Sequence, residues 1–175
     1  MGKGQHSILG IAIGWATASV VSERFVRLLV GLIGLAYCLD AWRKRHRTPA
    51  PKPADVPRGL FWGTISGFTS FVSHAGAPPY QMYVLPQRLD KMIFAGTSTI
   101  LFAIVNAVKL VPYWALGQLS VDNLEIAALL FPFGIAATFA GVRLVRILPE
   151  VLFYRLVRTA LLLISLKLVY DGFAA

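Results

Sequence analysis

Long stretches without charge constrain this chain more than any other feature. Of its 175 residues, 59–87 form a run of 29 without Asp, Glu, Lys or Arg, and shorter uncharged runs fill 4–22, 92–108 and 126–142. A helix that crosses the hydrocarbon core of a bilayer needs about 20 mostly apolar residues. These runs therefore predict a membrane protein with several spans. Their polarity does not alternate, which argues against the strands of a barrel.

The composition excludes most soluble functions. Hydrophobic residues make up 57% of the chain and charged residues 14%, whereas soluble domains carry about 25% charged residues. The net charge of +9 comes from basic residues clumped between apolar runs. A nucleic-acid partner needs its basic residues along one solvated face, so none is expected. No Cys pair, Walker loop, nucleotide-binding glycine motif or nucleophile elbow occurs, so we expect no enzyme, no metal and no cofactor.

Six helical regions are expected, over 7–22, 25–42, 58–73, 92–113, 122–145 and 150–171. The predicted fold class is all-α, a polytopic integral membrane protein with the lipid bilayer as its first partner. One alternative stays open at the N-terminus. Lys3, an apolar stretch and the small residues 16–18 together imitate a secretory signal, so residues 1–18 would then be cleaved.

A basic, proline-rich segment divides the chain. Residues 43–58 carry six Lys and Arg, one acid and four prolines. Positively charged loops stay in the cytoplasm, so this segment is expected to face the cytoplasm in a multi-pass protein of the cell (inner) membrane. The predicted division is 1–42 with two helices, 43–57 as the linker, and 58–175 as the remainder.

The uncharged run 59–87 begins and ends at basic residues, Arg58 and Arg88. It should therefore enter and leave the membrane on one side, as a hairpin or a broken helix. Gly76 permits positive φ, and Pro78 and Pro79 cannot donate backbone hydrogen bonds. We expect a break at these residues and a new helical stretch from Tyr80. Irregular backbone at membrane depth needs protein around it or a wet cavity, so this is the predicted site.

A short internal repeat suggests the architecture. Residues 10–14 resemble the segment from Gly134, and residues 22–28 resemble 149–156 when one residue is gapped. Both copies run into an apolar helix that ends at an aspartate, Asp40 or Asp171. The two copies are expected to start on opposite sides of the membrane, as in the inverted repeats of secondary transporters. Chance similarity between apolar hairpins is the alternative. Nothing before residue 10 corresponds to 59–114, so the first repeat looks incomplete.

Several segments together resemble a known family. They are Gly63 with Gly67, residues 74–79, residues 95–98, Asn106, and residues 141–153. Their order and spacing are similar to the second half of the TauE/SafE-type sulfite exporter family, with 8–42 matching the end of the first half. The resemblance implies an inner-membrane permease for sulfite, sulfonates or related small sulfur-containing anions. The chain departs from the family pattern by lacking most of the first half. The alternative is therefore a truncated, non-transporting subunit that pairs with another copy, as a homo-oligomer, or with a partner.

Physical chemistry favours an anion site at the break. An oxyanion needs donors in place of its hydration shell, and the N-terminus of a helix offers unpaired N–H groups and a positive dipole end. His74 can donate a hydrogen bond and can change charge near neutral pH, which would couple a proton to the anion. The alternative is that His74 packs as an ordinary hydrogen-bonded residue. The predicted substrate-binding residues here are His74, Gly76, Pro78 and Pro79.

The helix predicted over 92–113 supplies the second set. Ser98 and Lys109 lie within about 20° of one helical face, and Asn106 about 80° away. Thr97, Ser98 and Asn106 offer side-chain hydrogen bonds, and Lys109 offers a cation. The alternatives are that Thr97 and Ser98 bond the preceding turn of their own helix and that Lys109 anchors the helix at the interface.

Overall fold

The structure is a computed structural model that describes residues 11, 22–44, 50–117 and 120–174. The described elements are α2 (Glu23–Arg43), α3 (Val56–Ser73), α4 (Ala77–Val84), the 3-10 turn η1 (Leu85–Gln87), α5 (Lys91–Ala115), α6 (Val121–Ile147) and α7 (Glu150–Ala174). No strand occurs among the described residues, so the all-α prediction is confirmed. The helix predicted over 7–22 and the signal alternative fall almost entirely outside the described residues.

Three helices are long and apolar enough to cross a membrane, Glu23–Arg43, Lys91–Ala115 and Asn123–Ile147. On α6 every residue whose side chain is described is exposed or half-exposed, although the helix is apolar. Such a surface suits lipid and not water. The chain is therefore a polytopic membrane protein, as its uncharged runs predicted.

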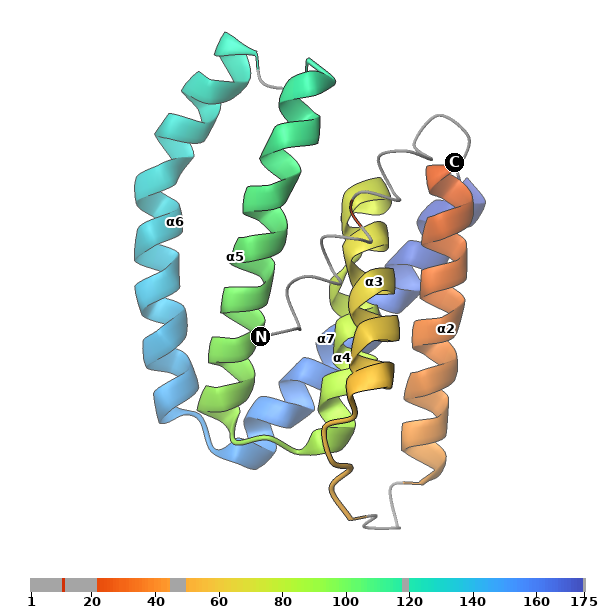
Figure 1. Cartoon of the computed structure of the whole chain (residues 1–175). Coiled ribbons are helices and arrows are strands. Elements are labelled where there is room, and N and C mark those ends of the chain that lie inside the picture. Colours follow the sequence, from red (N-terminus) through yellow and green to blue (C-terminus); the bar gives the residue numbers. More distant parts are fainter. Residues whose placement is uncertain (1–10, 12–21, 45–49, 118–119, 175) are drawn as a thin grey trace. The chain divides into compact units, whose positions relative to one another are not determined.

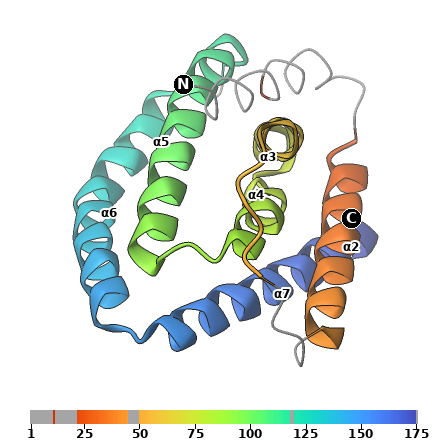
Figure 2. The same ribbon diagram turned by 60° about the horizontal axis from the view of Figure 1, so that its bottom comes forward.

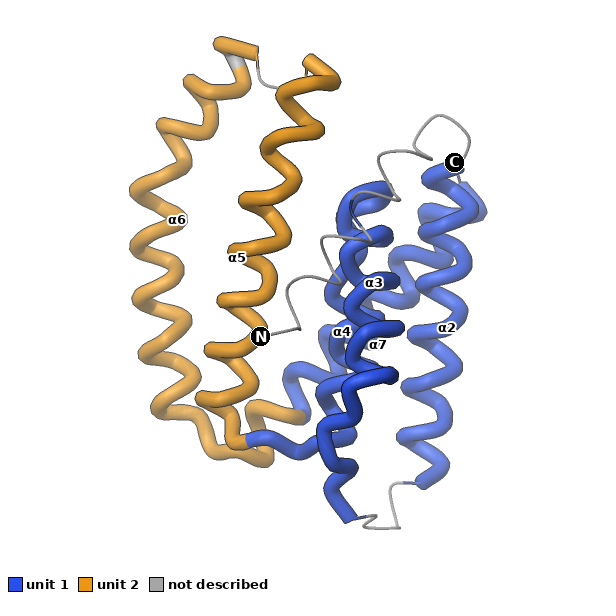
Figure 3. The backbone as a smooth tube through the Cα atoms, viewed as in Figure 1, with its two compact units in different colours: residues 1–89, 155–175 blue, residues 90–154 orange. Residues whose placement is uncertain are grey.

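The chain divides into two compact units (Figure 3). Unit 1 comprises residues 1–89 and 155–175, and unit 2 comprises 90–154. Unit 1 thus holds α2, α3, α4, η1 and most of α7, while unit 2 holds α5, α6 and the first residues of α7. This division follows spatial contacts, whereas the boundaries predicted at 42 and 57 followed the sequence repeat and the linker.

The core of unit 1 forms where α2 meets the α3–α4 segment and α7. Val26 and Val30 of α2 are buried with Ala75 and Leu168, and Phe68 and Val72 of α3 pack against them. These side chains come from segments far apart in the sequence, so apolar packing holds the ends of unit 1 together.

Helices α2 and α7 approach each other closely through glycine. Gly172 faces Leu28, and Gly31 faces Val169, so the residue number rises along one helix as it falls along the other. The two helices are therefore antiparallel. A residue without Cβ lets two backbones approach, which is how helices commonly associate in a membrane.

Unit 2 is a helical hairpin of α5 and α6 (Figure 1). The Asp90 carboxylate caps α5 by accepting hydrogen bonds from the backbone N–H groups of Met92 at 2.7 Å and Ile93 at 3.4 Å. The Lys91 Nζ donates to the carbonyls of Arg146 at 3.0 Å and Leu148 at 2.5 Å. One lysine thus ties the start of α5 to the end of α6, where a helix C-terminus favours a positive charge.

Candidate functional site

The segment α3–α4–η1 starts and ends at the same place in unit 1. The backbone N–H of Lys52 donates to the Pro86 carbonyl at 3.0 Å, and the Tyr83 hydroxyl donates to the Asp55 carbonyl at 3.0 Å. The chain therefore returns beside the point at which it entered. This agrees with the hairpin expected from the basic residues at both ends of the uncharged run.

Helix α4 begins at Ala77, three residues before Tyr80, where the sequence predicted the start of the new helical stretch. Helix α3 ends at Ser73, His74 adopts the left-handed conformation with φ 54° and ψ 17°, and α4 begins at Ala77. Pro78 and Pro79 belong to the first turn of α4 and not to the break. Proline suits that turn because its missing N–H would have had no partner within the helix.

Four hydroxyl residues line one buried face of α3. Ser66, Thr69, Ser70 and Ser73 have exposed fractions of 0%, 2%, 5% and 7%. Their spacing of three, four and seven residues places them on the same side of the helix. Buried polar groups cost free energy unless they find hydrogen-bond partners, so the partners of this face matter.

These hydroxyls hold the backbone of the break. The Ser66 hydroxyl donates to the Gly76 carbonyl at 2.7 Å. The Thr69 hydroxyl lies 2.8 Å from the Ile65 carbonyl of its own helix and 3.1 Å from the Ala75 carbonyl at the break. The Thr69 carbonyl in turn accepts hydrogen bonds from the Ser73 hydroxyl at 3.0 Å and the Ala75 N–H at 3.1 Å. The Gly76 carbonyl, which a continuous helix would pair, is thus satisfied by a side chain of α3. Our sequence interpretation missed these residues, although their helical spacing within an apolar run was a usable signal.

The start of α4 keeps two backbone donors. Pro78 and Pro79 have no N–H, and the N–H of Tyr80 donates to the Gly76 carbonyl at 3.4 Å. The N–H groups of Gly76 and Ala77 make no hydrogen bond to any described residue. They lie at the positive end of the helix dipole, where an anion is favoured.

The predicted residues at the break differ in burial. His74 is exposed, whereas Gly76, Pro78 and Pro79 are buried. The imidazole is therefore accessible at the surface of unit 1, while the other three residues form the packed wall behind it.

A fully buried serine of α7 lies behind the same wall. Ser165 has an exposed fraction of 0%, and its hydroxyl has no hydrogen-bond partner among the described residues. It lies against Gly34 of α2, and the Cβ of Pro78 is 4.0 Å from where a Cβ on Gly34 would stand. Gly34 therefore lets α7 reach the first turn of α4.

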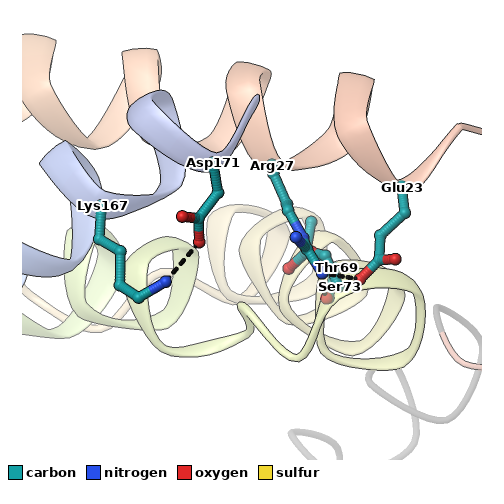
Figure 4. Close-up of polar contacts among 6 residues, drawn as sticks. All are labelled: Glu23, Arg27, Thr69, Ser73, Lys167 and Asp171. Carbon is teal, nitrogen blue, oxygen red and sulfur yellow. Dashed lines mark hydrogen bonds and ion pairs between the residues drawn. The ribbon is translucent and has the colours of Figure 1, made fainter. Parts of the chain in front are cut away.

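Ion pairs in unit 1 form within α2 and within α7, between residues one helical turn apart. Arg27 pairs with Glu23, and the Lys167 Nζ lies 2.5 Å from the Asp171 carboxylate. Figure 4 shows both pairs in one view with Thr69 and Ser73 of α3. Neither pair leaves a net charge on its helix turn.

The second predicted set lies on α5, in unit 2. The Ser98 hydroxyl donates to the Phe94 carbonyl at 2.6 Å, which is the bond to its own helix considered above as an alternative. Thr97 is half-buried and Asn106 is exposed. Lys109 is only 4% exposed, and its Nζ lies 5.6 Å from the centre of the Tyr113 ring. The two predicted sets thus belong to different compact units.

No group of three metal-binding side chains occurs among the residues that the structure describes. The two backbone N–H groups at the start of α4 are hydrogen-bond donors, which suit an anion better than a divalent cation, because such a cation prefers carboxylates.

Comparisons with known proteins identify the family. The model of the family described as sulfite exporter TauE/SafE matches residues 5–168. No curated protein and no solved structure matches the chain. The family consists of membrane transporters and not of enzymes, in agreement with the membrane-spanning helices found here. The chain belongs to the sulfite exporter TauE/SafE family.

Proposed function

We propose that this chain is a permease for sulfite or a related small sulfur-containing anion, and that it works by alternating access. It resides in the inner membrane of the cell with residues 43–58 facing the cytoplasm, where their positive charges would keep them. Membership of the family and three helices able to span a membrane support the general assignment. The anion and the mechanism rest on the broken hairpin.

The observation that carries the proposal is the start of α4. Two backbone N–H groups, those of Gly76 and Ala77, have no partner among the described residues and stand at the positive end of a helix dipole. The exposed His74 is two residues away from Gly76. An oxyanion at this place could accept hydrogen bonds from the two neutral backbone N–H groups and from the His74 imidazole, which can become positively charged.

Such a site is suited to transport because it binds weakly. A fixed pair of arginines would hold an oxyanion through charge-assisted, bidentate bonds. Backbone donors replace part of the hydration shell but bind the anion less tightly than arginines would, so the anion can dissociate on the other side of the membrane. The buried hydroxyl of Ser66 acts indirectly, since it holds the Gly76 carbonyl at the break and leaves the N–H groups of the break available.

Flux through proteoliposomes tests the proposal. The purified chain is reconstituted, and uptake of radiolabelled sulfite is compared with uptake by protein-free vesicles. We expect saturable uptake that thiosulfate competes for. Folded protein, verified by circular dichroism, that gives no flux of either anion above the protein-free background contradicts the permease assignment.

Variants connect the flux to the break. His74→Asn removes the titratable imidazole but keeps a residue that tolerates the left-handed conformation, so we expect a loss of flux without a loss of folding. Ser98→Ala should also lower flux if α5 contributes to the path. Lys52→Ala, in the linker, is the matched control and should leave flux unchanged. Equal flux in His74→Asn and Lys52→Ala would remove His74 from the site.

A further inference from the structure

The sequence of α2 returns in α7. Segments 24–40 and 155–171 align without a gap, 131 positions apart, and are identical at seven of their 17 positions. The identities include three charged positions, at which Arg24, Arg27 and Asp40 correspond to Arg155, Arg158 and Asp171. The gapped match in the sequence analysis pairs Arg27 with Arg155, whereas the ungapped alignment pairs Arg27 with Arg158, three residues later.

Contacts in unit 1 select the same ungapped register. Gly34 lies against Ser165, and these two residues are each other's equivalents, 131 positions apart. In an antiparallel pair of helices, a residue can touch its own equivalent only where a two-fold axis crosses the pair. The Gly34–Ser165 contact is therefore the point at which a two-fold axis relating α2 to α7 would cross the pair, as an inverted repeat requires.

The two ends of this pair are not in the same state. Arg24 donates from Nε to the Gly172 carbonyl at 2.8 Å and from Nη2 to the Phe173 carbonyl at 3.3 Å. Its equivalent, Arg155, is exposed and makes no hydrogen bond to a described residue. Figures 1 and 2 show α7 close to α2 near the C-terminus of the chain.

The two-fold axis predicts the missing contact. Subtracting 131 positions from Gly172 and Phe173 gives Ala41 and Trp42, at the end of α2. Arg155 would therefore meet the carbonyls of Ala41 and Trp42 if the pair closed at its other end. The same type of bond would form there, between a guanidinium and the carbonyls that end a helix, where positive charge is favoured.

We propose that Arg24 and Arg155 are alternating latches of the α2–α7 pair. Arg24 closes one end in the state seen here, and Arg155 closes the other end in a second state in which Arg24 has let go. The proposal rests on the proposed function, since a transporter that works by alternating access needs two states open to opposite sides. Exchanging one bond for an equivalent one keeps the two states close in free energy, so substrate binding can shift the balance. Both arginines act as positioning residues.

Spin-label distances test the latches without transport. One pair of labels replaces Phe25 and Phe173, and the other replaces the equivalent residues Leu156 and Trp42. All four side chains are exposed, with fractions of 61%, 67%, 49% and 64%. Cys38 is first replaced with alanine so that labels attach only at these positions. The two pairs report the two ends of α2–α7 by matched measurements.

Arg24→Gln should lengthen the Phe25–Phe173 distance and shorten the Leu156–Trp42 distance together. We expect the second state to rise about tenfold in population, the factor that corresponds to about 1.4 kcal/mol. Arg24→Lys keeps one donor group and should lie between wild type and Arg24→Gln, which also covers the case that the glutamine variant does not fold. Arg43→Gln, on the same helix, is the control and should change neither distance. Arg155→Gln should leave the dominant distance of each pair at its wild-type value and lower the population of the second state about tenfold.

A longer first distance in Arg24→Gln or Arg24→Lys with an unchanged second distance would overturn the proposal, because Arg24 would then be a local clasp only. The distances are measured without substrate. Absence of sulfite flux would therefore count against the proposed function and not against the latches.

Discussion

Replacing Gly31 with alanine tests the close approach of α2 to α7. A Cβ at this position would lie 2.7 Å from the Val169 Cγ2, 2.8 Å from the Val169 backbone N and 2.9 Å from the Ser165 carbonyl oxygen. Comfortable contacts of this kind begin at about 3.5 Å. Two of the three atoms belong to the α7 backbone and cannot rotate away, so the helices must separate by about 0.7 Å.

The free energy follows from two opposing effects. Forcing an extra methyl group into a packed contact destabilises by about 1–3 kcal/mol, while Gly→Ala in a helix interior stabilises by about 1 kcal/mol through helix propensity. Gly96 on α5 provides the matched control, because a Cβ there would meet nothing within 4 Å. The propensity gain is common to both variants. The difference in stability between Gly31→Ala and Gly96→Ala should therefore be about 1–3 kcal/mol, with Gly31→Ala less stable.

Unfolding of both variants by SDS in mild detergent micelles, followed by circular dichroism, measures this difference. The spin-label pair at the Arg24 end offers an independent check, since the helix separation should broaden its distance distribution only in Gly31→Ala. Equal unfolding midpoints for the two variants would refute the close approach of the backbones at Gly31.

Three further substitutions test local features. Ser66→Ala removes the 2.7 Å bond to the Gly76 carbonyl and should lower the free energy of unfolding by about 0.5–1.5 kcal/mol, whereas Thr138→Ala, at an exposed hydroxyl that bonds its own helix, should change it little. Lys91→Met removes two hydrogen bonds to the end of α6 and should speed amide hydrogen exchange between α6 and α7. Unchanged exchange there would show that Lys91 does not stabilise the end of α6. Asp90→Ala removes the cap of α5 and should cost about 0.5–2 kcal/mol, most of which Asp90→Asn should restore; equal losses in both would contradict capping.

Helix positions in this chain could be predicted from the sequence because two signals coincide. Apolar length defines a span, and charged residues mark its ends, so the predictions of 25–42 and 150–171 come close to α2 at Glu23–Arg43 and α7 at Glu150–Ala174. The break between α3 and α4 could also be predicted, from Gly76 and the two prolines. Its exact position could not be predicted, because Pro78 and Pro79 are equally compatible with a break and with the first turn of a new helix.

The surroundings of individual polar residues were beyond the sequence. In a membrane span the side that faces lipid and the side that faces protein are both apolar, so hydropathy does not show that Asn106 is exposed while Lys109 is buried. The role of Ser66 depends on a carbonyl ten residues away across a turn. Local pattern cannot reveal such a contact until the turn is known.

The meeting of Lys52 with Pro86 and of Asp55 with Tyr83 bears on how the protein is made. A segment whose two ends remain together can insert into a bilayer from one side, as a folded hairpin, after its flanking helices have inserted. No hydrophilic loop has to be carried through the hydrocarbon for this to happen. The membrane-insertion machinery would then translocate only the short connections of the remaining helices, and the basic linker would stay on the side where the ribosome released it.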